Sequence, residues 1–130
     1  MLDRPIVKPR PVYLNLVRIR LPLPGIVSFL HRVSGALLVL AGIPLLLAVV
    51  GRGLRSPEAY ADLQAMFAHP LARLVALGLV WACVQHFLSG LRHLLLDLHV
   101  GIDLASARKS SAFVFVAALV VTLAIGVRLW

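Results

Sequence analysis

The sequence is poor in charged residues, in acidic residues above all, and in cysteine. Charged residues make up 14% of the 130-residue chain and hydrophobic residues 61%, against about 25% and about 45–50% in soluble domains. So short a chain cannot bury that much apolar surface in a core of its own, which excludes an ordinary soluble domain. Cys83 is the single cysteine, so this chain alone cannot build a cysteine-ligated zinc or iron–sulfur site. Its apolar surroundings predict a packing role.

The charges that are present are mostly basic, with 13 Lys and Arg against 5 Asp and Glu. They gather in the N-terminal tail and in loops, and not along one helical face. This distribution indicates contact with anionic lipid headgroups and argues against a nucleic-acid partner. No clear cleavage site follows the first apolar run, so we expect membrane insertion without processing.

Three stretches of 16 to 18 residues contain no Asp, Glu, Lys or Arg: 35–50, 74–91 and 110–127. With its flanks, each stretch reaches the roughly 20 residues needed to cross about 30 Å of hydrocarbon. We therefore expect an all-α integral membrane protein with three transmembrane helices. The expected boundaries are a cytoplasmic tail over 1–24 and one transmembrane domain over 25–130, with helices at about 25–50, 70–98 and 110–130.

Two local signals refine this layout. Pro44 falls inside the first membrane helix, where a proline is tolerated at the cost of a kink. Ser56-Pro57-Glu58 has the residue types of a helix start, namely an N-cap serine, a proline at the first position and an acid in the first turn. This pattern predicts a short surface helix that ends near Phe67.

The placement of basic residues predicts the orientation in the membrane. The tail and the second loop share one side and carry Arg4, Lys8, Arg10, Arg18, Arg20, Arg108 and Lys109. The opposite side carries Arg52, Arg55 and Arg128. Positively charged segments stay in the cytoplasm, so we expect a multi-pass protein of the cell inner membrane with a cytoplasmic N-terminus and a C-terminus on the other side.

Two polar stripes interrupt the expected membrane helices. The first consists of Ser28, His31, Arg32 and Gly35; the second consists of His86, Ser89, Gly90, His93 and Asp97. Offsets of three, four and seven residues place the members of each stripe on one helical face. Because ionisable residues are costly in lipid, they are candidates for a functional site.

The chemistry of these stripes favours a haem. His86 lies roughly 9 Å deeper than Arg92, at about 1.5 Å per residue, and neutral imidazole is a good ligand for haem iron. Arg32 could pair with a haem propionate or, together with Ser28, polarise a quinone carbonyl. Only His86 is deep, so a six-coordinate haem would need a second ligand from another chain. The alternatives are that His86 merely hydrogen-bonds a neighbouring helix and that Arg32 extends to the headgroups.

Several segments closely resemble the cytochrome b membrane-anchor subunit of succinate dehydrogenase. Near the N-terminus they are residues 10–16 (RPVYLNL), 20–24 (RLPLP) and 28–35 (SFLHRVSG). In the second membrane helix residues 86–97 (HFLSGLRHLLLD) match that family's HxxxGxRHLxxD segment, and 56–58 (SPE) also looks familial. The resemblance spans residues 9 to 130.

The resemblance implies half of a haem-binding helical bundle that a second small anchor subunit completes. His86 is then the axial ligand of a haem b shared with that subunit, and Ser28 and Arg32 belong to the quinone site. His31 and Arg32, with His93 as a weaker candidate, lie near the haem propionates. The implied partners are an iron–sulfur subunit, a flavoprotein subunit that oxidises succinate, membrane lipid, and ubiquinone or menaquinone as substrate.

Electron transfer to quinone, in the tricarboxylic acid cycle and the respiratory chain, is thus the expected function. An anchor of a quinol:fumarate reductase would have the same fold, but electrons would flow in the opposite direction, from quinol. A haem-free structural anchor would use His86 only to bond a partner helix. A small transport protein would need a polar path through the whole membrane, whereas polar residues here gather toward one side and the third helix is featureless.

Overall fold

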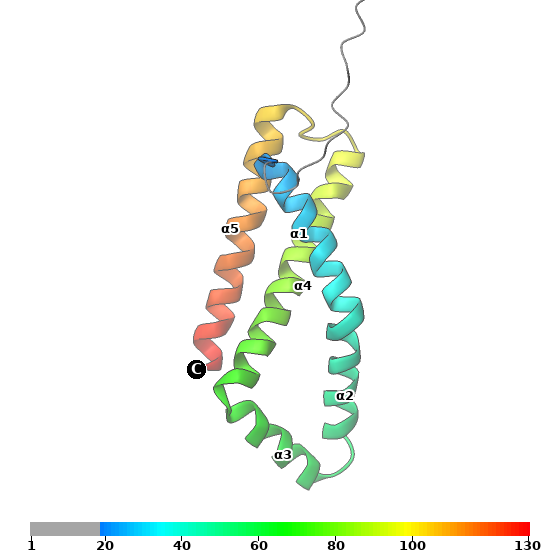
Figure 1. Ribbon diagram of the computed structural model, residues 1–130, viewed down its shortest axis with the longest axis vertical. Coiled ribbons are helices and arrows are strands. Elements are labelled where there is room, and N and C mark those ends of the chain that lie inside the picture. The colour runs from blue at the N-terminus through cyan, green and yellow to red at the C-terminus, as the bar shows by residue number, and fades with distance from the viewer. Residues whose placement is uncertain (1–18) are drawn as a thin grey trace, which may run out of the picture.

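The computed structural model describes residues 19–130, so most of the expected tail lies outside the described residues. The described chain is all-helical. Its elements are α1 (Leu23–Leu37), the π-helical turn η1 (Leu38–Gly42), α2 (Ile43–Gly53), α3 (Pro57–Ala68), α4 (Pro70–Asp97) and α5 (Leu104–Leu129). The first three form one continuous helical segment (Figure 1).

Three helical segments are long and apolar enough to cross a membrane: Leu23–Gly53 with 31 residues, Pro70–Asp97 with 28 and Leu104–Leu129 with 26. At about 1.5 Å per residue, even the shortest exceeds the roughly 30 Å of a hydrocarbon core. The expectation of three long apolar helices is confirmed. Their bounds differ from the expected ones by a few residues at most ends, and most at the start of α5.

Pro44 is accommodated by a widened turn. Because proline lacks an N–H and its ring crowds the preceding turn, a regular α-helix cannot continue through it unchanged. Here the five residues before Ile43 adopt a π-helical turn, and the main-chain N–H of Ile43 donates to the carbonyl of Leu38. The kink expected at Pro44 therefore takes the form of a π-helical turn.

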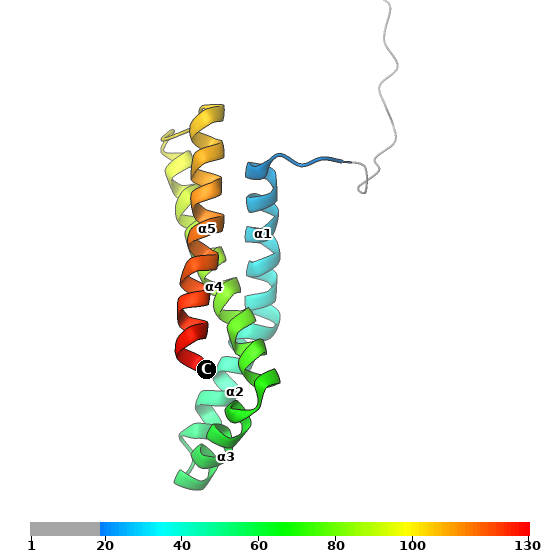
Figure 2. The ribbon, with the colours of Figure 1, turned by 90° about the vertical axis from the view of Figure 1, so that its left-hand side faces the viewer.

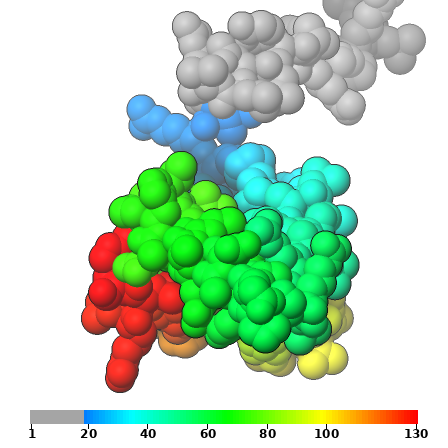
Figure 3. All heavy atoms as spheres, turned by 90° about the horizontal axis from the view of Figure 1, so that it is seen from below, coloured from blue at the N-terminus to red at the C-terminus, as the bar shows by residue number. Residues whose placement is uncertain are grey.

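The short helix α3 begins as its sequence predicts. The Ser56 hydroxyl accepts a hydrogen bond from the main-chain N–H of Ala59 at 3.2 Å, and Pro57 occupies the first helical position. The helix crosses the end of the bundle between α2 and α4, which Figure 3 shows from below. An exposed ion pair between Arg52 and Asp62, 3.2 Å apart, joins α2 to α3.

The helix α5 begins at Leu104, six residues before the expected start at Ser110. Its N-cap is Asp103, whose carboxylate accepts a hydrogen bond from the main-chain N–H of Ser106 at 2.9 Å. Hydrogen bonds from Ser106 hold the pKa of the Asp103 carboxyl below its ordinary value. The cap is therefore fully formed above the ordinary carboxyl pKa and is lost only as the pH falls through the lowered value.

The helix α4 packs against both α1 and α5 (Figure 1, Figure 2). The apolar residues buried at these contacts are small or medium in size, such as Val27, Ala82 and Ala118, while larger side chains such as Leu40, Phe113 and Leu123 point outward. Close packing through small residues with an apolar exterior is the pattern of helices that are solvated by lipid.

Candidate functional site

Three histidines from two helices meet where α1 packs against α4. The rings of His31 and His86 are stacked, with centroids 4.3 Å apart and an angle of 16° between their planes. His93 lies one heptad beyond His86 on the same face of α4, and its centroid is 5.1 Å from that of His31 at a tilt of 41°. The structure thus brings together three of the residues that the sequence selects.

The ring of His86 is held by the main chain of α1. Its Nδ1 lies 3.0 Å from the carbonyl oxygen of His31. The hydroxyl of Ser34 donates to the same carbonyl at 3.0 Å and lies 3.5 Å from His86 Nδ1. Ser34 is buried and His86 is half-buried, so the edge of the imidazole is anchored while part of the ring stays accessible.

A glycine at position 35 makes this contact possible. A Cβ added to Gly35 would lie 2.7 Å from His86 Cε1, closer than any real Cβ contact, whereas one added to Gly90 would lie at an ordinary contact distance of 3.5 Å from His31 Nε2. In the structure His31 faces Gly90, and the glycine that faces His86 is Gly35 in the other helix. Sequence spacing does not show this, because the relative rotation of α1 and α4 decides it.

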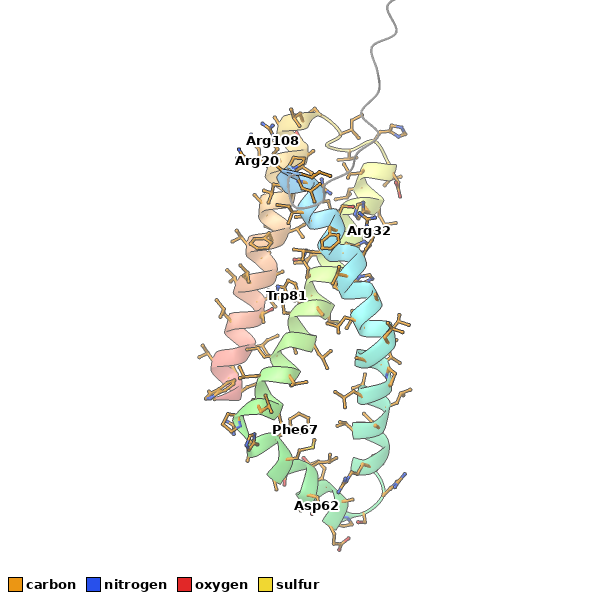
Figure 4. All side chains as sticks on the ribbon, viewed as in Figure 1. Arg20, Arg32, Asp62, Phe67, Trp81 and Arg108 are labelled. Carbon is orange, nitrogen blue, oxygen red and sulfur yellow. The ribbon has the colours of Figure 1, made fainter. Side chains whose placement is uncertain are left out.

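The quinone-site candidates, Ser28 and Arg32, lie within one turn of His31 in α1. Ser28 is half-buried, whereas Arg32 is exposed and extends from the outer side of α1 (Figure 4). His31 points toward α4, and Arg32, one residue later, points about 100° away around the helix. The arrangement makes the Arg32 guanidinium accessible to a molecule or a partner chain outside this bundle.

Two buried polar residues of α4, Gln85 and Arg92, are not among the residues that the sequence selects. They lie on one face with Ser89 of the second stripe, at offsets of zero, seven and four residues respectively. Gln85 is fully buried and its Nε2 donates to Ser89 Oγ at 3.0 Å, while its Oε1 has no hydrogen-bond partner. The signal that could have found Gln85 and Arg92 is their helical spacing with Ser89, which they share with the histidine stripe.

Arg92 differs most from expectation. Its position near the end of a membrane helix predicts a solvated residue or a partner of Asp97, but its side chain is only 6% exposed. Arg92 Nε donates to Ser110 Oγ at 3.0 Å, and Nη2 donates to the carbonyl of Ala107 at 3.3 Å. Burial follows because the guanidinium crosses to the first turns of α5, so Arg92 ties α4 to α5.

Replacing Arg92 with methionine is expected to destabilise the protein by roughly 1–3 kcal/mol, because the polar groups of Ser110 and Ala107 lose a buried donor. The measurement is the thermal unfolding temperature of the purified protein in detergent, in its complex. Arg108→Met is the matched control, since Arg108 is exposed. Equal unfolding temperatures for the two variants would contradict this role of Arg92.

Toward the opposite end, α4 separates from η1 and α2 and leaves an apolar groove of about 820 Å³. Its walls include Leu38, Val49, Leu79 and Cys83. Cys83 is exposed to this groove, so it is not enclosed by packing as its apolar neighbours suggest. The groove begins about one turn from Gly35 and His86, and it continues the face of α4 that carries His86.

Within residues 19–130, no three His, Cys, Asp or Glu side chains gather as ligands for a bare metal ion.

Comparisons with known proteins find a matching family and similar proteins. A family model described as "Succinate dehydrogenase/Fumarate reductase transmembrane subunit" matches residues 7–125. The chain is similar to the succinate dehydrogenase cytochrome b556 subunit of Paracoccus denitrificans, with 37% identity over 102 residues, which cover 78% of each protein. It is also similar to the subunit of the same name from Coxiella burnetii (strain RSA 493 / Nine Mile phase I), with 31% identity over 122 residues that cover 93% of this chain and 97% of that protein.

Proposed function

This chain belongs to the succinate dehydrogenase/fumarate reductase transmembrane subunit family, and on that premise we propose that it is the haem b-binding, quinone-site anchor subunit of a succinate dehydrogenase. It passes electrons from an iron–sulfur subunit to quinone and performs no chemistry on succinate, which a flavoprotein subunit oxidises. The names of both relatives, cytochrome b556 subunits, support haem b as the cofactor.

The single observation that carries this proposal is the anchored imidazole of His86 inside a membrane-spanning helix. The residues around it fit a haem: one accessible imidazole, a glycine where any Cβ would collide with that ring, and an apolar groove that starts about one turn away. When bound, haem b would accept and return one electron at a time. His86 would hold the iron from this chain, and His31 and Arg32, with His93 as a weaker candidate, would pair with the propionates.

Ser28 and Arg32 would form half of a quinone site. The exposed guanidinium of Arg32 would donate a charge-assisted hydrogen bond to a quinone carbonyl, and the Ser28 hydroxyl would donate to the same oxygen. Both residues lie near the start of α1, on the side where the soluble subunits would dock. A second anchor subunit would supply the rest of this site and a further histidine to hold the haem, so the complete helical bundle would be shared.

The distribution of charge supports a cytoplasmic N-terminus. Arg20 and Arg108 lie at the end of the bundle where α1 begins, and Asp62 lies at the opposite end, on α3 (Figure 4). More basic residues on the first side are expected to keep it in the cytoplasm. The proposed location is the cell inner membrane, with the C-terminus on the opposite side from the N-terminus.

The test compares membranes of cells with and without this chain. We expect loss of succinate-dependent quinone reduction when the chain is missing, while the released soluble subunits still reduce an artificial dye with succinate. Quinone reduction at the wild-type rate without the chain would refute the proposal. An anchor of a fumarate reductase would instead be favoured if quinol-driven fumarate reduction were the faster direction. Loss of quinone reduction from a complex that contains no haem would favour the structural anchor.

A further inference from the structure

We propose that α1 positions the haem ligand of α4: the main-chain carbonyl of His31, together with Ser34 and Gly35, fixes the ring of His86 so that Nε2 is the nitrogen that binds iron. This inference rests on the proposed function and deepens it. It assigns positioning roles to Ser34 and Gly35, to which the sequence alone assigns no role, and it selects one of the two imidazole nitrogens.

The choice of nitrogen follows from hydrogen-bond chemistry. A carbonyl oxygen only accepts, so His86 Nδ1, at 3.0 Å from the carbonyl of His31, must carry the proton in this contact. In a neutral imidazole the other nitrogen is then unprotonated. A histidine that ligates a metal commonly donates its second ring N–H to a carbonyl, which fixes the tautomer and raises the basicity of the ligand. His86 already has this second-nitrogen contact within its own chain.

The orientation of the ring is fixed from two further directions. One face of His86 is covered by the stacked ring of His31, with centroids 4.3 Å apart. The ring edge that carries Nδ1 and Cε1 packs against Gly35. A Cβ added to Gly35 would lie 3.1 Å from Nδ1 and 2.7 Å from Cε1. No side chain fits at Gly35 unless His86 moves, so Gly35 is required for the contact between Nδ1 and the carbonyl.

Ser34 adjusts the strength of the same contact. Its hydroxyl donates to the His31 carbonyl at 3.0 Å, so two donors share that oxygen. When the Ser34 hydroxyl is removed, His86 is the only side chain among the described residues that donates to the His31 carbonyl. The Nδ1 hydrogen bond should then strengthen, and a more basic imidazole stabilises oxidised iron. Displacement of the ring by a larger residue at position 35 should have the opposite effect.

The experiment measures the reduction potential and the visible and EPR spectra of the haem in the purified complex. Gly35→Ala is expected to shift the potential upward, or to lose the haem, with altered EPR g values. Ser34→Ala, which removes one hydroxyl from a buried position, is expected to shift the potential downward with the haem retained. Gly78→Ala is the matched control within α4, because an added Cβ there has no other atom within 4 Å.

Different results would refute the positioning role and the proposed function. Wild-type potentials and spectra in both Gly35→Ala and Ser34→Ala would overturn the positioning role while leaving the proposed function intact. If Gly35→Ala does not assemble, the downward shift in Ser34→Ala decides the question, and an unchanged potential there overturns the inference. A wild-type complex without haem would refute both the inference and the haem part of the proposed function.

Discussion

Replacement of Arg32 by alanine is expected to lower the rate of succinate-dependent quinone reduction at least tenfold. Arg32 is exposed near the start of α1, where its guanidinium can reach a quinone carbonyl. A hydrogen bond from a charged group contributes roughly 1.5–3 kcal/mol, and about 1.4 kcal/mol corresponds to a factor of ten. A lysine at this position should recover only part of the rate, since it is a point charge without the planar donor fork of arginine.

Two controls separate a quinone role from a general defect. Succinate oxidation with an artificial dye should proceed at the wild-type rate in Arg32→Ala, because the flavoprotein is untouched. Arg108→Ala removes another exposed arginine at the same end of the bundle (Figure 4) and should leave quinone reduction unchanged. If Arg32→Ala reduces quinone as fast as Arg108→Ala, Arg32 does not contact the quinone and only extends to the headgroups.

Replacement of His86 by alanine is expected to remove the b-type haem band from the purified complex. No other histidine of the described chain can take over the ligand role without rearrangement, because His31 faces Gly90 and His93 lies about two turns closer to the membrane surface. The loss should be nearly complete, since His86 would be the residue by which this chain holds the iron. The measurement is the dithionite-reduced minus oxidised absorption spectrum.

The matched control for His86→Ala is His99→Asn. His99 is an exposed loop histidine with φ of 60°, and asparagine tolerates that conformation. Its spectrum should equal that of the wild type. A haem band that persists unchanged in His86→Ala would mean that the iron is ligated elsewhere and that His86 serves the packing of α1 against α4.

The three long helices and α3 can be predicted from the sequence because each depends on local composition. Long uncharged stretches predict the three spans, and Ser56 with Pro57 predicts the start of α3. The expected start of the third helix at Ser110 is wrong because Asp103, an aspartate immediately before the first helical residue, acts as the N-cap, a position that aspartate commonly takes. Likewise, Pro44 indicates a distortion but does not specify a π-helical turn.

Contacts between helices are harder to predict from the sequence. A helical wheel shows which residues share a face, but it does not show which neighbour that face meets. The spacing of His31 and His86 places each of them on a polar face of its own helix, but it does not show that the two rings stack or that His86 packs against Gly35. The burial of Arg92 does not follow from its sequence position for the same reason. Only the rotation of α4 relative to α5 brings its side chain to Ser110 and Ala107.

The most direct test of the central claim is the haem content of the purified wild-type complex, determined per copy of this chain from its pyridine haemochrome spectrum. The proposed function predicts one b-type haem for each copy, because each chain would supply one of the two axial histidines and a different anchor subunit the other. One haem for every two copies would indicate that two copies of this chain share it. A complex that contains no haem would contradict the account, and His86 would then be a residue of helix packing alone.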